Sequence, residues 1–152
     1  MGRQPEELIV FGRSLGSIPA IEFAHRYPEV AGLVLESGIA DPLERVLMRV
    51  TPGELGVSLS ALQEEFRERL DSVAKLRARR KPTLILHTQQ DTLVDVSHAE
   101  RLASGPAENV RLVLFPEGDH NTIFSDNRER YVAELRELIE LCTRGETRYA
   151  PR

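Results

Sequence analysis

The stretch Leu8-Ile9-Val10-Phe11-Gly12-Arg13-Ser14-Leu15-Gly16 places a short apolar run directly before a Gly-x-Ser-x-Gly pattern. A continuous apolar run that ends at a glycine is typical of a strand buried on both faces of a sheet. Apolar residues at helical spacing follow, at Leu15, Ile18, Ile21 and Ala24. We therefore predict a strand over residues 8–11, a sharp turn at Ser14 and a helix over residues 15–27.

The same alternation of strand and helix patterns continues along the chain. Further buried strands are predicted at residues 32–35, 83–87 and 110–115, with helical patterns between and after them. Such an alternation predicts an α/β fold, with a parallel sheet of about four strands and helices on both faces. Ligands of such sheets bind beyond the carboxyl ends of the strands.

Two helical patterns fall between the second and third predicted strands, so residues 39–81 are predicted to form a small helical insertion. The longer of the two is predicted to begin at a capping box made by Ser60 and Gln63. Asp126 is predicted to cap the last helix. One domain is expected over residues 1–143, and residues 144–152, which lack apolar periodicity, are expected to be a loose tail.

Composition excludes several classes of protein. The chain has 152 residues, 41% of them hydrophobic and 29% charged, and a net charge of −4, which gives no sign of a nucleic-acid surface. No apolar run approaches the ~20 residues that span a bilayer, and the first residues do not form a signal peptide. The single cysteine, Cys142, excludes an internal disulfide and gives no zinc signature. We expect a cytoplasmic protein without metal or cofactor.

Ser14 is the candidate nucleophile. A serine in a strained strand-to-helix turn exposes its hydroxyl, and Gly12 and Gly16 are expected to be needed where strand and helix approach closely. The alternative interpretation is a glycine-rich turn without chemistry.

A serine hydroxyl needs a base, and the chain offers His25, His87, His98 and His120. His120 alone lies in a glycine-containing loop after a predicted strand, at the sheet edge expected for Ser14. We therefore predict that His120 is the base. The alternative is a loop histidine with no role.

The orienting acid is expected in another loop at this edge. Asp91 and Asp95 both follow the third strand, and Asp91 is nearer the strand end. Asp119 adjoins His120 in sequence, where it is badly placed to accept a hydrogen bond from the imidazole. Asp91 is predicted to be the acid, although it could instead be a turn residue or a helix cap.

The order serine, aspartate, histidine is that of the α/β-hydrolase superfamily. The segment Ile9–Ala20 resembles the nucleophile elbow of this superfamily, Leu84–Val94 resembles its acid loop, and Gly118-Asp119-His120 resembles its histidine loop. The match runs from about Leu8 to Leu141 and looks most like the small intracellular esterase and depalmitoylase-like branches. Thr88 and Asp95 depart from the family pattern, where a glycine and a proline are usual.

The resemblance implies a serine hydrolase of carboxylic esters or thioesters that acts through an acyl-enzyme. Ser14, Asp91 and His120 would be its catalytic residues, and the backbone N–H of Leu15 would donate to the oxyanion. The substrate would be a small molecule or an acyl group, and residues 39–81 occupy the position of the family's cap.

Members of the superfamily have further strands before the elbow strand, so we expect this chain to be the C-terminal part of such a fold. The run Leu8–Phe11 would then have an unpaired edge that favours self-association. The rival hypothesis is a catalytically silent fragment or an interaction module.

Overall fold

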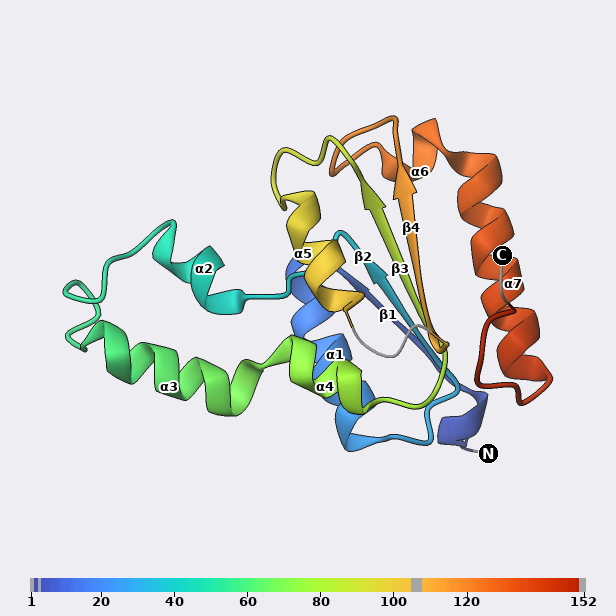
Figure 1. Cartoon of the computed structure of the whole chain (residues 1–152), viewed down its shortest axis with the longest axis horizontal. Helices are drawn as coiled ribbons and strands as arrows, with labels where there is room; N and C mark the ends of the chain where they lie inside the picture. The colour runs from blue at the N-terminus through green and yellow to red at the C-terminus, as the bar shows by residue number, and fades with distance from the viewer. Residues whose placement is uncertain (1, 3, 105–107, 151–152) are drawn as a thin grey trace.

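The computed structural model describes residues 2, 4–104 and 108–150. Its centre is a four-stranded sheet made of β1 (Ile9–Arg13), β2 (Gly32–Glu36), β3 (Thr83–Thr88) and β4 (Val110–Phe115). Every neighbouring pair is parallel, and the strands lie in the order β1-β2-β3-β4 (Figure 1). The α/β fold and the parallel sheet of four strands predicted from the sequence are confirmed.

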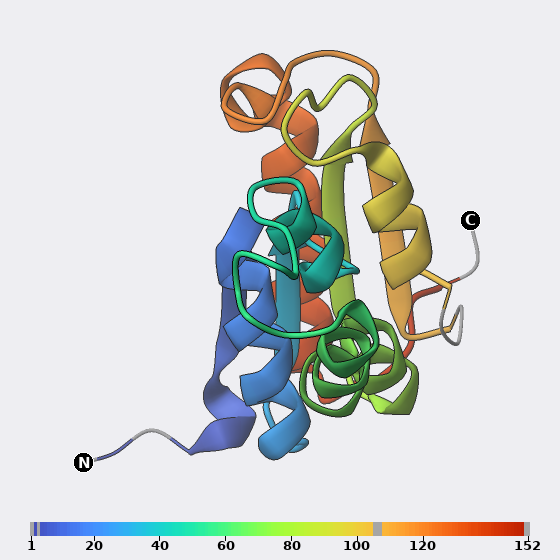
Figure 2. The ribbon, with the colours of Figure 1, turned by 90° about the vertical axis from the view of Figure 1, so that its left-hand side faces the viewer.

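Helices cover both faces of this sheet (Figure 2). One face carries α1 (Ser17–Arg26), α4 (Ser72–Ala78) and α5 (Val96–Leu102), and the other carries α7 (Arg128–Thr143). Leu33 and Leu35 pack into the first of these cores, whereas Val34 between them packs into the second. Because successive side chains of a strand point to opposite faces, a strand buried on both faces has a continuous apolar sequence.

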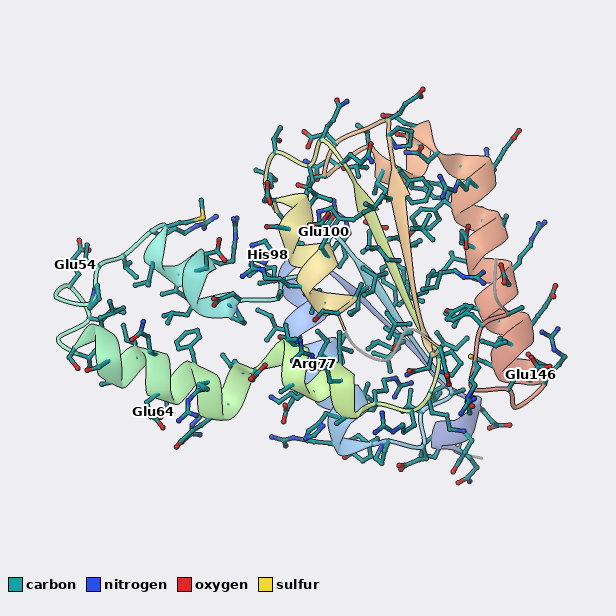
Figure 3. All side chains as sticks on the ribbon, viewed as in Figure 1. Glu54, Glu64, Arg77, His98, Glu100 and Glu146 are labelled. Carbon is teal, nitrogen blue, oxygen red and sulfur yellow. The ribbon has the colours of Figure 1, made fainter. Side chains whose placement is uncertain are left out.

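An arm formed by α2 (Pro42–Leu47) and α3 (Leu59–Leu70) projects from one side of the sheet (Figure 1). Glu54 and Glu64 lie on its outer part (Figure 3). The predicted capping box at Ser60 is wrong, because the hydroxyl of Ser58 accepts the hydrogen bond from the Ala61 N–H at 3.1 Å.

The longer predicted helix is divided in two at Asp71, whose carboxylate accepts a hydrogen bond from the Ala74 N–H at 2.8 Å and so begins α4. The α4 helix packs against α1 through the buried side chain of Leu76. The last residues of the segment predicted as an insertion, 72–81, therefore belong to the body of the domain.

The C-terminal region also differs from expectation. A short helix, α6 (Ile123–Asp126), precedes α7, whose N-cap is Asn127 without a side-chain cap bond, so Asp126 does not cap it. Within residues 144–150, expected to be loose, Tyr149 donates its backbone N–H to the Glu108 carbonyl at 2.8 Å. The Arg111 guanidinium lies 4.2 Å from the centre of the Tyr149 ring, so Tyr149 contacts the body of the domain.

No helix in the part of the chain that the structure describes is both long and apolar enough to cross a membrane.

Candidate active site

Ser14 lies where β1 passes into α1 through a short 3-10 turn, η2 (Ser14–Gly16). Its φ is 51°, in the left-handed region that residues with a side chain seldom adopt. A non-glycine residue is held there only when the surrounding structure imposes that conformation, and such residues are frequent at functional sites. Ser14 is half-buried and lines a pocket.

The two glycines of the pattern have different roles. A Cβ at Gly12 would lie 2.5 Å from the Ala20 Cβ and 2.6 Å from the Gly16 carbonyl oxygen, so only glycine fits there. A Cβ at Gly16 would meet no atom within 4 Å. The prediction that both glycines are required is therefore confirmed for Gly12 and wrong for Gly16. Of the two glycines, only Gly12 is required by the close packing of β1 against α1.

The structure brings Asp91 and His120 together. The two carboxylate oxygens of Asp91 lie 2.8 Å and 3.0 Å from Nδ1 of His120, and both side chains are buried. Asp91 Oδ1 also accepts hydrogen bonds from the backbone N–H groups of Leu93 at 2.9 Å and Val94 at 2.8 Å. This contact places the hydrogen of the neutral imidazole on Nδ1 and leaves Nε2 as an acceptor.

The charge of Asp91 follows from the same contacts. Burial alone would raise the pKa of its carboxyl, but the hydrogen bonds from the Val94 N–H and from His120 outweigh burial and hold the pKa below its ordinary value. Asp91 is therefore ionised at neutral pH.

The other two aspartates near this site have different tasks. Asp119 Oδ1 accepts hydrogen bonds from the backbone N–H of Thr92 at 2.8 Å and of His120 at 2.6 Å, so it ties the histidine loop to the acid loop. Asp95 is exposed and caps α5 by accepting from the Ser97 N–H at 2.9 Å. Neither contacts the His120 imidazole through a hydrogen bond in the described chain.

Three further histidines were candidates for the base. His25 is exposed on α1. His98 lies on α5 beside the connection to the arm (Figure 3), and its Nδ1 accepts a hydrogen bond from the Ala40 N–H at 3.2 Å. His87 is buried with Nε2 2.8 Å from the Val94 carbonyl oxygen and 3.6 Å from Asp91 Oδ2. Burial lowers the pKa of His87, which keeps this second neighbour of Asp91 neutral.

Ser14, Asp91 and His120 all follow the carboxyl ends of parallel strands and so lie at one edge of the sheet. No hydrogen bond within the described residues joins the Ser14 hydroxyl to His120. The link between their two loops is Arg13, whose Nη2 donates to the His120 carbonyl oxygen at 2.6 Å and to Asn121 Oδ1 at 3.0 Å.

Arg13 is itself held by Glu36, which lies at the end of β2. Its Nε donates to Glu36 Oε1 at 2.6 Å, and the hydroxyl of Tyr131 donates to Glu36 Oε2. Glu36 is only 5% exposed. This network was not predicted from the sequence, although one signal was present: a lone carboxylate ends an otherwise apolar strand, and buried carboxylates require partners.

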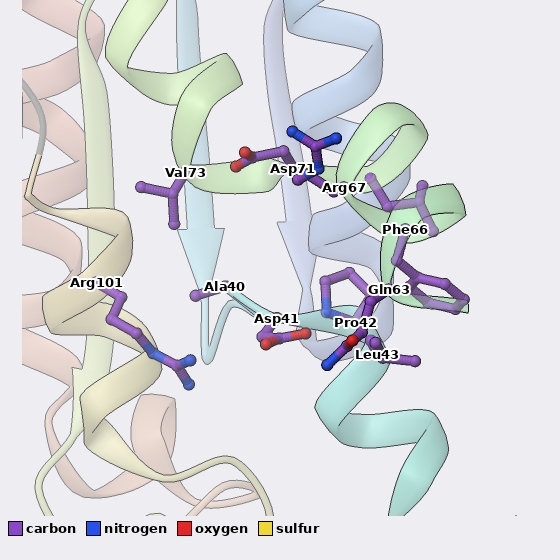
Figure 4. A pocket seen from close by; sticks show the side chains of 11 residues that line it. Ala40, Asp41, Pro42, Leu43, Gln63, Phe66, Arg67, Asp71, Val73 and Arg101 are labelled. Carbon is purple, nitrogen blue, oxygen red and sulfur yellow. The ribbon is translucent and has the colours of Figure 1, made fainter. Parts of the chain in front are cut away.

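A pocket of about 390 Å³ opens beside Ser14. Its walls come from the Ser14 turn and α1, from the arm and from the acid loop, and they include Ile18, Phe66 and Leu93. A second pocket of about 350 Å³ lies between the arm and the body and shares Pro42, Phe66 and Leu70 with the first (Figure 4). Among the described residues, no group of three or more histidine, cysteine, aspartate or glutamate side chains is arranged to hold a metal ion.

Comparisons with known proteins agree on one superfamily, although no protein-family model matches the chain. The chain is 26% identical over 140 residues to the alpha/beta hydrolase domain-containing protein aho-3 of Caenorhabditis elegans, and 26% identical over 145 residues to the alpha/beta hydrolase domain-containing protein 17B of Xenopus laevis. Each match covers 92% of the chain. The crystal structure of the 2,6-dihydroxy-pseudo-oxynicotine hydrolase superposes with a TM-score of 0.65 at 27% identity and covers 98% of the chain. The chain belongs to the α/β-hydrolase superfamily.

A further likeness to a solved structure shows the same α/β-hydrolase fold. The esterase domain of a Rhodothermus marinus protein superposes with a TM-score of 0.62 at 24% identity, over 84% of this chain and 59% of that one. The α/β-hydrolase chain spans 38% and 46% of the two curated relatives and 44% of the pseudo-oxynicotine hydrolase. It thus spans less than half the length of the curated relatives that it matches.

Proposed function

We propose that this α/β-hydrolase chain carries the machinery for hydrolysis of carboxylic esters or thioesters through an acyl-enzyme, with Ser14 as nucleophile, His120 as base and Asp91 as acid. The observation that carries the proposal is the buried Asp91–His120 pair, which lies at the same sheet edge as Ser14 in its left-handed turn. This combination is the one that activates a serine hydroxyl.

In the proposed reaction, Nε2 of His120 takes the proton of the Ser14 hydroxyl as its oxygen attacks the carbonyl carbon. The resulting imidazolium gives that proton to the leaving group as the carbon–oxygen or carbon–sulfur bond breaks. Water then repeats the attack on the acyl-enzyme and releases the acid. The ionised Asp91 stabilises the imidazolium in both halves of the reaction.

The oxyanion of each tetrahedral intermediate needs donors at a fixed position. Leu15 follows the nucleophile at the start of η2, where backbone N–H groups are not used by the helix. We assign its N–H to the oxyanion. The hydrogen bond between Ser14 and His120 would form when substrate is bound, because such bonds are often loose in a free enzyme.

The pocket beside Ser14 supports an acyl or similarly apolar substrate group. Its volume of about 390 Å³ lies within the usual range for a small-molecule site, and most of its lining residues are apolar. The arm supplies part of this wall, which agrees with a role of residues 39–70 in shaping the pocket.

A fluorophosphonate probe followed by mass spectrometry tests the proposal. We expect Ser14 to be labelled, and labelling to be lost in Ser14→Ala and His120→Ala. Ser37 is the matched internal control, because it also has a positive φ, of 47°, but is fully buried. A label on Ser37 or Ser125 with Ser14 unmodified would contradict the assignment.

A second candidate function, an interaction module, is favoured by β1. In the described chain β1 pairs only with β2, and Phe11 on this strand is 50% exposed. An unpaired strand edge with apolar side chains favours association with another strand. Light scattering over a range of concentrations tests it: we expect concentration-dependent self-association that Phe11→Lys reduces. Met48→Lys, on the arm, is the control, and a monomer at every concentration would contradict this candidate.

A further inference from the structure

We propose that the ester or thioester hydrolysed at Ser14 carries an anionic group, a carboxylate or a phosphate, that binds Arg45 and Arg49 at the pocket beside Ser14. This inference rests on the proposed function and specifies the class of its substrate.

The first observation is the chemical character of the pocket wall. Apart from Ser14, the described residues that line this pocket are apolar except for Arg45 and Arg49, and none of them carries a carboxylate. Arg45 lies on α2, which ends at Leu47, and Arg49 lies in the turn that follows it, so both arginines of this pocket come from the same part of the arm. The whole chain is acidic, with 24 aspartates and glutamates against 20 lysines and arginines, so this local excess of positive charge does not reflect composition.

The second observation is that the two acidic residues at the N-terminal end of α2 are engaged elsewhere. Glu44 Oε2 accepts a hydrogen bond from Arg101 at 2.9 Å, and Asp41 caps α2 by accepting from the Glu44 N–H at 3.1 Å. Arg45 contacts the Met48 sulfur at 3.2 Å. Within the described residues, neither Arg45 nor Arg49 forms an ion pair with a carboxylate of this chain. Their charge is therefore available to a ligand.

The arm itself provides a comparison. Two of its other arginines pair with glutamates on the same helix, Arg67 with Glu64 and Arg69 with Glu65. The second pocket, which shares Phe66 with the first, is lined by Asp41 and Asp71 together with Arg67 and Arg101 (Figure 4). Opposite charges are thus balanced in that pocket, whereas the pocket beside Ser14 is cationic only.

The arrangement fits an amphipathic ester. The apolar part of the substrate would lie against side chains such as Ile18 and Phe66, and its carbonyl would face Ser14. A guanidinium group has a planar set of donors that matches the oxygens of a carboxylate or a phosphate. The anion would therefore bind at Arg45 and Arg49, several bonds away from the scissile carbonyl, on either the acyl or the leaving-group side.

Binding to the Ser14→Ala chain, measured by calorimetry or by NMR titration, tests anion recognition without turnover. Two pairs of esters distinguish the two sides of the substrate. Monomethyl glutarate against methyl pentanoate places the carboxylate on the acyl side, and acetoxyacetate against propyl acetate places it on the leaving-group side. We expect the anionic member of at least one pair to bind about tenfold more tightly than the neutral member. Added salt should weaken this preference, because both arginines are at least partly exposed.

The double variant Arg45→Gln/Arg49→Gln should remove the preference. Arg67→Gln is the matched control, because it removes an arginine from the same arm but from the other pocket, and it should leave the preference unchanged. Equal binding of charged and neutral esters, or a preference that survives the double variant, would overturn the inference. Hydrolysis of neutral esters by the wild-type chain without any anion preference would overturn it while leaving the proposed function intact. Tight anion binding without labelling of Ser14 would instead overturn the proposed function.

Discussion

Arg13 donates a hydrogen bond from Nη2 to the backbone carbonyl oxygen of His120 at 2.6 Å. The residue that precedes the proposed nucleophile thus holds the backbone of the proposed base. Glu36 binds the other side of the same guanidinium, so one arginine links the Ser14 turn, the end of β2 and the histidine loop.

Replacing Arg13 should therefore slow the chemistry as well as weaken the fold. Arg13→Gln leaves the buried Glu36 with a weaker set of partners, which we expect to cost about 1–3 kcal/mol in the free energy of unfolding. It should also slow fluorophosphonate labelling of Ser14 by about tenfold or more, because His120 loses a constraint. Arg26→Gln removes an exposed ion pair of α1 and is the control for both measurements. Unchanged labelling in a destabilised Arg13→Gln chain would mean that the contact is structural only.

The assignment of the acid is tested by two isosteric changes. Asp91→Asn should lower esterase turnover or labelling by up to about four orders of magnitude, because the imidazole loses the partner that sets its tautomer. Asp95→Asn should have a small effect, because Asp95 caps α5 and does not contact the imidazole. If Asp95→Asn is the more damaging change, the acid is misassigned.

The two glycines of the pattern should differ in their tolerance of alanine. Gly12→Ala places a methyl group against Ala20 and the Gly16 carbonyl, and we expect it to lower the free energy of unfolding by about 1–3 kcal/mol or to prevent folding. Gly16→Ala should change stability by less than about 0.5 kcal/mol, because the space is open and φ is −65°. Urea denaturation of the two variants measures the difference, and equal losses would contradict the geometry of the turn.

Stability should fall when the pH is lowered from 7.5 toward 5.5. Burial lowers the pKa of His87 and of His98 below their ordinary value of 6.5, so the unfolded chain takes up protons in this range more readily than the folded chain. Each histidine can lower the free energy of unfolding by at most about 1.4 kcal/mol for each pH unit below about 6.5. The pKa of Asp91 is also lowered, but its contribution is retained above about pH 4 and does not change in this window.

The pH dependence of stability is measured from the denaturation midpoints of the wild-type chain and of His87→Gln at pH 7.5 and pH 5.5. The variant should lose part of the pH dependence, since the glutamine amide can still donate to the Val94 carbonyl but does not titrate in this range. His25→Gln, at an exposed position, should retain all of it. The same slope in His87→Gln as in the wild-type chain would show that His87 does not titrate as proposed.

The sequence by itself determined the elements that depend on local pattern. Apolar runs within β1 to β4, interrupted in β4 by Arg111, alternate with helical spacing. This alternation is enough to predict a parallel sheet covered on both faces, because each pattern indicates which sides of an element are buried. The Gly-x-Ser-x-Gly pattern after β1 predicts the turn at Ser14, since its strain and its close approach to α1 arise within a few residues.

Only the tertiary structure decided the relationships that join distant segments. The sequence predicted Asp91 as the acid, but its contact with His120 depends on how two loops meet at one sheet edge. The same holds for the contact of Arg13 with the histidine loop and for the two arginines of the arm that line the pocket beside Ser14. The division of the long helix at Asp71 has the same origin, because α4 packs on α1 whereas α3 packs on α2. Contacts of this kind are set by the packing of elements far apart in the chain. The spacing of side chains along one element therefore does not predict them.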